Sequence, residues 1–301
     1  MQLDSRDLRN KMEVILAEKY GFCFGVKRAI KITEKIAQNN PNTLTLGPLI
    51  HNPLEISRLQ QNFGVRVQED IDNLGDSKSV IIRTHGITKQ NLETLQTKGV
   101  SITDATCPFV TKPQQIVEKM SAEGYHIVIF GDSNHPEVRS VMSYSSTTPI
   151  VVSSIESFRQ IKKIPKKIAI VSQTTKQIEQ FLQIVQYLVT NAMEVRVFNT
   201  ICNATFENQE ATRILSQKAD IMIIVGGKTS SNTKQLFYIA KNHCNDSYLV
   251  EDENDIEETW FKDKKICGIS AGASTPNWVI KNVENLIKNL DSHSCIFRHA
   301  F

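Results

Sequence analysis

Three cysteines stand at corresponding places in the chain, each ending an apolar segment that reads as a β-strand. They are Cys23, Cys107 and Cys202. Each is followed, 28 residues later, by a polar residue in a loop: His51, His135 and Ser230. Equal intervals in three places indicate an internal repeat, so we expect the three cysteines to be structurally equivalent. Three thiolates brought together from distant segments would be suited to holding a metal centre.

A lone cysteine is more often a small buried side chain than a ligand, but placement in three repeats argues against that interpretation. Three thiolates without a fourth suit a Cys₃His zinc site or an iron–sulfur cluster with one iron left for another ligand. Closely spaced cysteine pairs, usual in structural zinc sites, are absent, so the cluster is preferred. A zinc-stabilised binding module and a cysteine–histidine hydrolase with Cys107 or Cys23 as nucleophile remain alternatives. Cys244, Cys267 and Cys295 are interpreted as structural.

Three of the seven histidines also end apolar strands: His51, His85 and His135. We expect them to bind an anion, because protonated imidazole donates hydrogen bonds from both ring nitrogens. The third repeat offers neutral donors at the matching places, Ser230, Ser231, Asn232 and Ser274. The segment VGGKTSSN is no P-loop, because that motif requires glycine where Met222 stands.

One carboxyl group lies among these donors. Glu137 follows His135 by two residues, where a negative charge would oppose anion binding. A proton-delivering role explains it best, and we expect Thr174 to connect it to the substrate.

The elements that must position these residues follow a regular rhythm. Segments rich in Val and Ile alternate with polar turns and helical patterns from about residue 13 to 288, as in parallel α/β proteins. Helices are predicted over 26–40, 111–124 and 208–220, after the three cysteines. Because ligands bind at the carboxyl ends of parallel strands, the cysteines and polar loops lie at the functional edges.

The predicted fold is therefore α/β, with three small parallel-sheet domains in a pseudo-three-fold arrangement around a central iron–sulfur cluster. The expected boundaries are 12–106, 107–201 and 202–288, with mobile tails at 1–11 and 289–301.

The composition indicates a soluble globular protein. The 301 residues are 40% hydrophobic and 22% charged, with a formal net charge of +3. There is no basic tract for nucleic acid, no long apolar segment for a membrane and no apolar leader. We expect a cytoplasmic protein with neither a nucleic-acid nor a membrane partner.

Together the segments GFCFGVKRA, LIHN, THG, DATCPFVTK, NHPEV, SQTT, GGKTSSNT and SAGAST resemble the 4-hydroxy-3-methylbut-2-enyl diphosphate reductase (LytB/IspH) family, over residues 13 to 288. The resemblance implies one [4Fe–4S] cluster on Cys23, Cys107 and Cys202, whose open apical iron binds the substrate's C4 hydroxyl. It implies catalytic roles for Glu137, Thr174 and His135, with Thr175 and Thr205 nearby. It implies a substrate site in which Thr174 and Glu137 lie near the allylic hydroxyl and the diphosphate is surrounded by His51, His85, His135, Ser230, Ser231, Asn232 and Ser274.

The implied reaction takes two electrons and two protons, releases water and yields isopentenyl and dimethylallyl diphosphates, ending the non-mevalonate isoprenoid pathway. The implied electron donor is a small protein such as ferredoxin or flavodoxin. Two residues depart from the family pattern: Phe24 replaces a small residue after the first cysteine, and Asn208 replaces an arginine. Neither change removes a ligand or a proton donor.

Overall fold

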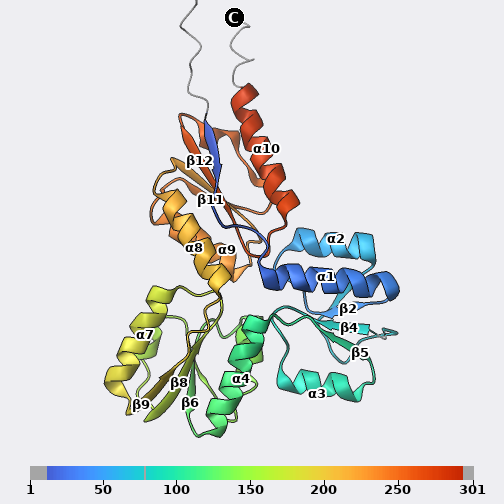
Figure 1. Cartoon of the computed structure of the whole chain (residues 1–301), viewed down its shortest axis with the longest axis vertical. Coiled ribbons are helices and arrows are strands. Elements are labelled where there is room, and N and C mark those ends of the chain that lie inside the picture. Colours follow the sequence, from blue (N-terminus) through green and yellow to red (C-terminus); the bar gives the residue numbers. More distant parts are fainter. Residues whose placement is uncertain (1–11, 78, 294–301) are drawn as a thin grey trace, which may run out of the picture. The chain divides into compact units, whose positions relative to one another are not determined.

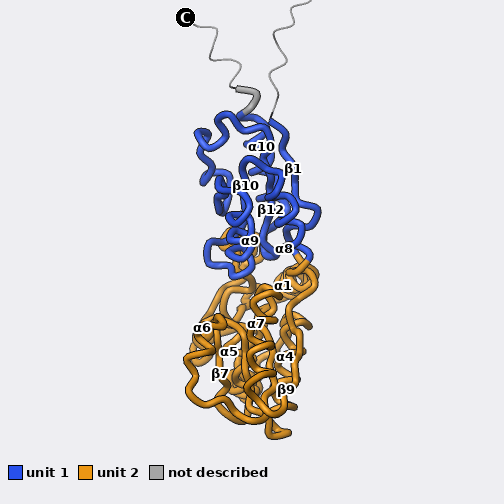
Figure 2. The backbone as a smooth tube through the Cα atoms, turned by 90° about the vertical axis from the view of Figure 1, so that its left-hand side faces the viewer, with its two compact units in different colours: residues 1–22, 207–301 blue, residues 23–206 orange. Residues whose placement is uncertain are grey.

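The computed structural model describes residues 12–77 and 79–293. The described chain forms two compact units, unit 1 with residues 12–22 and 207–293 and unit 2 with residues 23–206 (Figure 2). Unit 2 contains two four-stranded sheets and unit 1 contains one. Every strand pair in the three sheets is parallel, which confirms the predicted fold class.

The first sheet of unit 2 has the strand order β3-β2-β4-β5. Its elements are α1 (Phe24–Asn39), β2 (Leu44–Leu46), α2 (Pro53–Phe63), β3 (Arg66–Gln68), β4 (Ser79–Ile82), α3 (Lys89–Thr97) and β5 (Ser101–Asp104). Helices α1 and α2 lie side by side along one face, and α3 covers the other (Figure 1). Leu95 of α3 packs with Leu46 of β2 and Ile82 of β4.

The second sheet of unit 2 has the order β7-β6-β8-β9. Its elements are α4 (Pro108–Ala122), β6 (His126–Phe130), α5 (Pro136–Met142), β7 (Ile150–Val152), α6 (Ile155–Arg159), β8 (Lys167–Ser172), α7 (Ile178–Asn191) and β9 (Glu194–Val197). Alternate strand residues point to opposite faces. Ile127 and Ile129 therefore pack with α4 and α5, whereas Val128 and Phe130 pack with α6 and α7. Because both faces are covered, β6 is a continuous apolar run.

The sheet of unit 1 has the order β1-β12-β10-β11. Its elements are β1 (Glu13–Leu16), α8 (Asn203–Ser216), β10 (Ile221–Val225), α9 (Ser231–Lys241), β11 (Ser247–Val250), η1 (Glu253–Asp255), η2 (Glu258–Phe261), β12 (Ile266–Ala271) and α10 (Asn277–His293). The boundary between the units falls within α8. Strand β1, expected in the first repeat, pairs with β12 near the opposite end of the chain.

The repeat has a simple structural basis. Each sheet has two central strands and two edge strands, and the four follow the same order in all three sheets. One edge strand of each sheet, β1, β5 or β9, is followed by a cysteine. A helix follows each cysteine, as predicted, although each begins two to five residues earlier than expected. The exact domain boundaries and the pseudo-three-fold arrangement stay predictions.

Both ends of the chain were expected to be mobile tails. Residues 289–293 instead continue α10, while residues 1–11 and 294–301, including Cys295, lie outside the described residues. No helix in the described ranges combines the length and apolar character that crossing a bilayer requires.

Candidate active site

The three predicted ligand cysteines all stand at helix N-termini. Cys23 is the N-cap of α1 and Cys107 is the N-cap of α4, and neither side chain makes a capping hydrogen bond. Cys202 immediately precedes α8, and its carbonyl oxygen accepts a hydrogen bond from the Phe206 N–H at 3.0 Å. The partial positive charge at a helix N-terminus stabilises a thiolate. The fold thus places all three sulfurs at helix ends, whose partial positive charge acts against the cost of burying a thiolate.

The three thiols lie near one another in unit 2. A Cβ atom added to Gly25 would lie 2.5 Å from the Cys107 Sγ and 3.9 Å from the Cys23 Sγ. Burial raises the pKa of Cys107 to about 11, an effect that the backbone N–H of Phe109 opposes, and negative charge on Cys23 or Cys202 adds to the increase. Burial likewise raises the pKa of Cys202. Bound metal removes this penalty by replacing the protons with positive charge.

Two of the cysteines are attached to their sheets in the same way. The Cys107 N–H donates to the Thr84 carbonyl oxygen, and the Cys202 N–H donates to the Thr174 carbonyl oxygen, both at 3.0 Å. Thr84 follows β4 and Thr174 follows β8, which are equivalent central strands. The loops after the central strands thus hold the cysteines in position.

The three predicted histidines converge in unit 2. The ring centroids of His51 and His85 are 4.4 Å apart, and His135 lies 5.3 Å from the first and 5.4 Å from the second. His135 is the N-cap of α5, whereas His51 precedes Asn52, the N-cap of α2. The 28-residue interval therefore ends at a helix N-cap for His135 but one residue before the N-cap for His51. The two positions are close to equivalent without being identical.

The charge state of these histidines differs from the expectation. Burial lowers the pKa of His51, lowers that of His135 to about 4 and lowers that of His85 well below its ordinary value. The positive charge of Arg83 lowers all three further, and Lys176 does the same for His135. The rings are neutral at pH 7, so the expectation of protonated imidazoles is wrong for the protein without an anion.

These surroundings favour an anion over a metal cation. Arg83 lies against the loop after β2, since a Cβ on Gly47 would be 2.4 Å from its guanidinium. The buried His51 Nε2 has no hydrogen-bond partner among the described residues. The His135 Nδ1 accepts the Glu137 backbone N–H at 3.2 Å, so a neutral ring carries its proton on Nε2 and can donate it.

Glu137 is nearly fully buried, with 2% of its surface exposed, and Thr174 holds its carboxylate. The Glu137 Oε1 accepts the Thr174 backbone N–H at 2.6 Å, and Oε2 accepts the Thr174 hydroxyl at 2.7 Å. Burial raises the pKa of Glu137, and these two hydrogen bonds oppose the increase. Negative charge on Glu137 in turn raises the pKa of Cys107, so the carboxylate and the thiol lie close together.

The predicted donors of the third repeat lie in unit 1. Ser230 is the N-cap of α9, with its hydroxyl accepting the Thr233 N–H at 3.3 Å, and Ser231 and Asn232 open that helix. Asn232 is 5% exposed, and both polar atoms of its side chain lack a hydrogen-bond partner among the described residues. Ser274 lies in the loop after β12. Placement of this group against the histidines stays a prediction.

Several nearby residues were not predicted from the sequence. Arg83 and Lys176 supply fixed positive charge, and their only sequence signal is adjacency to the THG and SQTT segments. The Gln173 side chain bridges two loops, accepting the Asp132 N–H at 3.0 Å and donating to the Thr175 hydroxyl at 3.1 Å.

Other residues that the sequence singled out have different surroundings. Phe24 is 65% exposed, whereas Asn208 is buried in α8, where its carbonyl oxygen accepts the Thr212 hydroxyl. Thr205 is buried, and its backbone N–H lowers the pKa of Cys202. Cys244 and Cys267 are buried, in agreement with a structural role.

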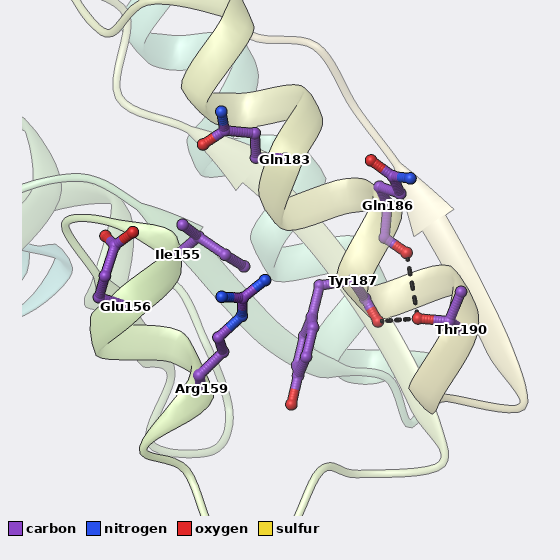
Figure 3. A pocket seen from close by; sticks show the side chains of 7 residues that line it. All are labelled: Ile155, Glu156, Arg159, Gln183, Gln186, Tyr187 and Thr190. Carbon is purple, nitrogen blue, oxygen red and sulfur yellow. Dashed lines mark hydrogen bonds between the residues drawn. The ribbon is translucent and has the colours of Figure 1, made fainter.

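A groove of about 510 Å³ lies apart from these residues, between α6 and α7 (Figure 3). It is lined by Ile155, Glu156, Arg159, Gln183, Gln186, Tyr187 and Thr190. The Arg159 guanidinium lies over the Tyr187 ring, 5.8 Å from its centroid. None of the predicted site residues lines this groove.

The sequence of residues 14–288 matches the model of the LytB protein family. The chain belongs to the LytB family. It is 62% identical over 279 residues to 4-hydroxy-3-methylbut-2-enyl diphosphate reductase of Helicobacter pylori (strain P12), covering 93% of this chain and 100% of that one. The same-named protein of Campylobacter fetus is 63% identical, with coverage of 93% and 98%.

Two solved structures extend the likeness of this LytB family member to the fold. One is (E)-4-hydroxy-3-methyl-but-2-enyl diphosphate reductase, described as the terminal enzyme of the non-mevalonate pathway, with 40% identity and a TM-score of 0.67, covering 92% of this chain and 99% of that one. The other is the E-1-hydroxy-2-methyl-but-2-enyl-4-diphosphate reductase of Plasmodium falciparum, with 27% identity and a TM-score of 0.87, covering 93% and 89%.

Proposed function

We propose that this protein is a 4-hydroxy-3-methylbut-2-enyl diphosphate reductase, the last enzyme of the non-mevalonate isoprenoid pathway. It removes the allylic hydroxyl as water, using two electrons and two protons, and forms isopentenyl and dimethylallyl diphosphates. Family membership, together with the full coverage of the H. pylori relative, supports this activity. Within the chain, the supporting observation is the double role of Thr174, which binds Glu137 through its N–H and hydroxyl and Cys202 through its carbonyl oxygen.

The cofactor of this proposal is one [4Fe–4S] cluster held by Cys23, Cys107 and Cys202. The partly buried thiols, their positions at helix N-termini and the close approach of α1 to the Cys107 Sγ all fit such a group. When bound, the cluster supplies electrons and a Lewis acid at the reacting hydroxyl. Cys23, Cys107 and Cys202 would hold this group close to Glu137, whose negative charge raises the pKa of Cys107.

In this proposal Glu137 delivers protons. Its raised pKa increases the protonated fraction near neutral pH, as a general acid requires. Thr174 orients the carboxyl group with two hydrogen bonds and can pass a proton through its hydroxyl. The proton taken up by the leaving hydroxyl therefore needs no bulk water next to the reacting bond.

The diphosphate anchors the other end of the substrate. His51, His85 and His135 donate to it within the field of Arg83 and Lys176. The diphosphate ligands predicted from the sequence also include Ser230, Ser231, Asn232 and Ser274. Binding energy from this unreacting group orients the allylic end for reaction.

The two rival functions receive less support. A nucleophilic cysteine needs a lowered pKa, but burial raises the pKa of Cys107 to about 11. A zinc module would not need the buried Glu137 and its partner. The test is anaerobic turnover of (E)-4-hydroxy-3-methylbut-2-enyl diphosphate with reduced methyl viologen. Formation of the two isomeric products supports the proposal, and an unreacted substrate with iron-loaded protein contradicts it.

A further inference from the structure

An exposed phenylalanine follows each of the three cysteines within four residues. Phe24, Phe109 and Phe206 are 65%, 42% and 50% exposed. Large aromatic side chains are among the groups that most often carry the binding energy of protein interfaces, and their exposure on a soluble protein calls for an explanation. Each of these phenylalanines lies within about one helical turn of a proposed cluster ligand.

Contacts between α1 and α4 hold two of these rings near each other. The absent Cβ of Gly25 lets the first turn of α1 approach the Cys107 Sγ closely. One turn further, the Arg28 guanidinium donates to the Thr106 carbonyl oxygen at 3.1 Å and to the Asp104 carbonyl oxygen at 3.4 Å. The N-termini of α1 and α4 therefore meet at the cysteines and expose Phe24 and Phe109 from one junction.

The faces of α1 and α4 that carry Phe24 and Phe109 also carry positive charge. Lys27 and Lys31 lie three and seven residues after Phe24 on α1, and Lys112 lies three residues after Phe109 on α4, spacings that place them on the same faces as the rings. All three lysines are exposed, and within residues 12–77 and 79–293 no acidic group forms an ion pair with them. Their charge is available to a partner.

We propose that this aromatic–basic surface, formed by Phe24, Lys27, Lys31, Phe109, Lys112 and Phe206, docks a small acidic electron-transfer protein. The inference rests on the proposed function, which consumes two electrons that the chain itself does not supply. Each docking event oxidises one reduced donor by one electron. Two such events, with two protons, reduce one substrate molecule and release one water.

The charge of the surface favours this partner over a second copy of the chain. Opposite charges steer association and orient the complex, whereas two copies of the same lysine-bearing surface repel each other. A modest apolar centre with a charged rim is also typical of electron-transfer complexes, which are small and short-lived. The exposed Phe24, unexplained by the family pattern, thereby gains a role.

The experiment uses the cluster-loaded protein and two probes, an FMN-containing flavodoxin and a [2Fe–2S] ferredoxin, with affinities measured by calorimetry at low and high salt. For at least one probe, Phe24→Ala should weaken binding about tenfold, and Lys27→Glu with Lys31→Glu should weaken it more and flatten its salt dependence. One matched control is Leu182→Ala, an exposed apolar residue on α7. The other is Lys163→Glu, in the exposed loop before the amino end of β8.

The small reductant methyl viologen separates this inference from the proposed function. Turnover driven by methyl viologen should change less than twofold in Phe24→Ala, while turnover driven by the protein donor falls with its affinity. Three results would each overturn the docking surface. They are wild-type affinity in both surface variants, no binding of either probe, and a dimer of the chain that Phe24→Ala dissociates. Absence of turnover with methyl viologen in the unaltered protein would instead contradict the proposed function.

Discussion

Glu137 and Thr174, 37 residues apart in the sequence, form a closed pair in which both carboxylate oxygens accept hydrogen bonds from the same threonine, at 2.6 and 2.7 Å. The pair lies at the carboxyl edge of the second sheet, with Glu137 in the first turn of α5 and Thr174 after β8. Because the Thr174 carbonyl oxygen also accepts the Cys202 N–H, one residue holds both the proposed proton donor and a proposed cluster ligand.

Replacing Glu137 by glutamine should remove the proton donor while keeping its shape. We expect turnover to fall by about 10² to 10⁴, the usual contribution of a general acid, with iron content and substrate affinity unchanged. Single-turnover rates with methyl viologen measure the turnover, absorption spectra measure the cluster content, and calorimetry measures the substrate affinity. Glu118→Gln, on the exposed side of α4, is the matched control. Wild-type turnover in Glu137→Gln would remove the proposed proton-donor role.

Replacing His51 by alanine should weaken the anion site. A hydrogen bond to a charged group contributes about 1.5–3 kcal/mol, so the pyrophosphate Kd should rise at least about tenfold. The absorption of the cluster should stay the same, because His51 is no ligand in this account. His126→Ala is the control, because His126 lies at the amino end of β6, whereas His135 follows the carboxyl end of the same strand. An unchanged pyrophosphate Kd would place the diphosphate elsewhere.

Pyrophosphate binding should take up protons at pH 7. The pKa of His135 is about 4 without an anion, and those of His51 and His85 are also lowered, so the rings start neutral. A bound anion stabilises the charged forms and raises these pKa values. The complex then holds more protons than the unbound protein, and affinity must fall as the pH rises.

Calorimetry in buffers of different ionisation enthalpy measures this uptake directly. The difference between the unaltered protein and His135→Asn cancels the titration of pyrophosphate itself. Equal proton uptake by the two proteins would show that His135 does not titrate with binding.

The sequence predicts the repeating part of the site well, for a physical reason. Parallel strands end at one edge of their sheet, so equal intervals place Cys107 and His135 at matching strand ends without knowledge of tertiary contacts. The pairing of β1 with β12 cannot be predicted in this way, because it joins segments about 250 residues apart. The lowered pKa values of the histidines cannot be predicted from the sequence either, because burial and the nearby charge of Arg83 arise only in the folded chain.

Gly25 provides a steric test of the cysteine site. A methyl group there would lie 2.5 Å from the Cys107 Sγ, so Gly25→Ala should displace that sulfur and lower the iron content. Gly99→Ala is the control: its φ of +66° makes the change strained, but no atom lies within 4 Å. We expect Gly99→Ala to lose about 1 kcal/mol of stability and keep its iron. Full iron content in Gly25→Ala would contradict this packing.

Iron and sulfide analysis with Mössbauer spectroscopy on anaerobically purified protein decides whether Cys23, Cys107 and Cys202 together hold a [4Fe–4S] cluster. We expect about four irons and about four sulfides per chain, and a severe loss of both when any one of the three cysteines becomes serine, while Cys244→Ser retains them. A colourless, zinc-loaded protein that still reduces the substrate would contradict it.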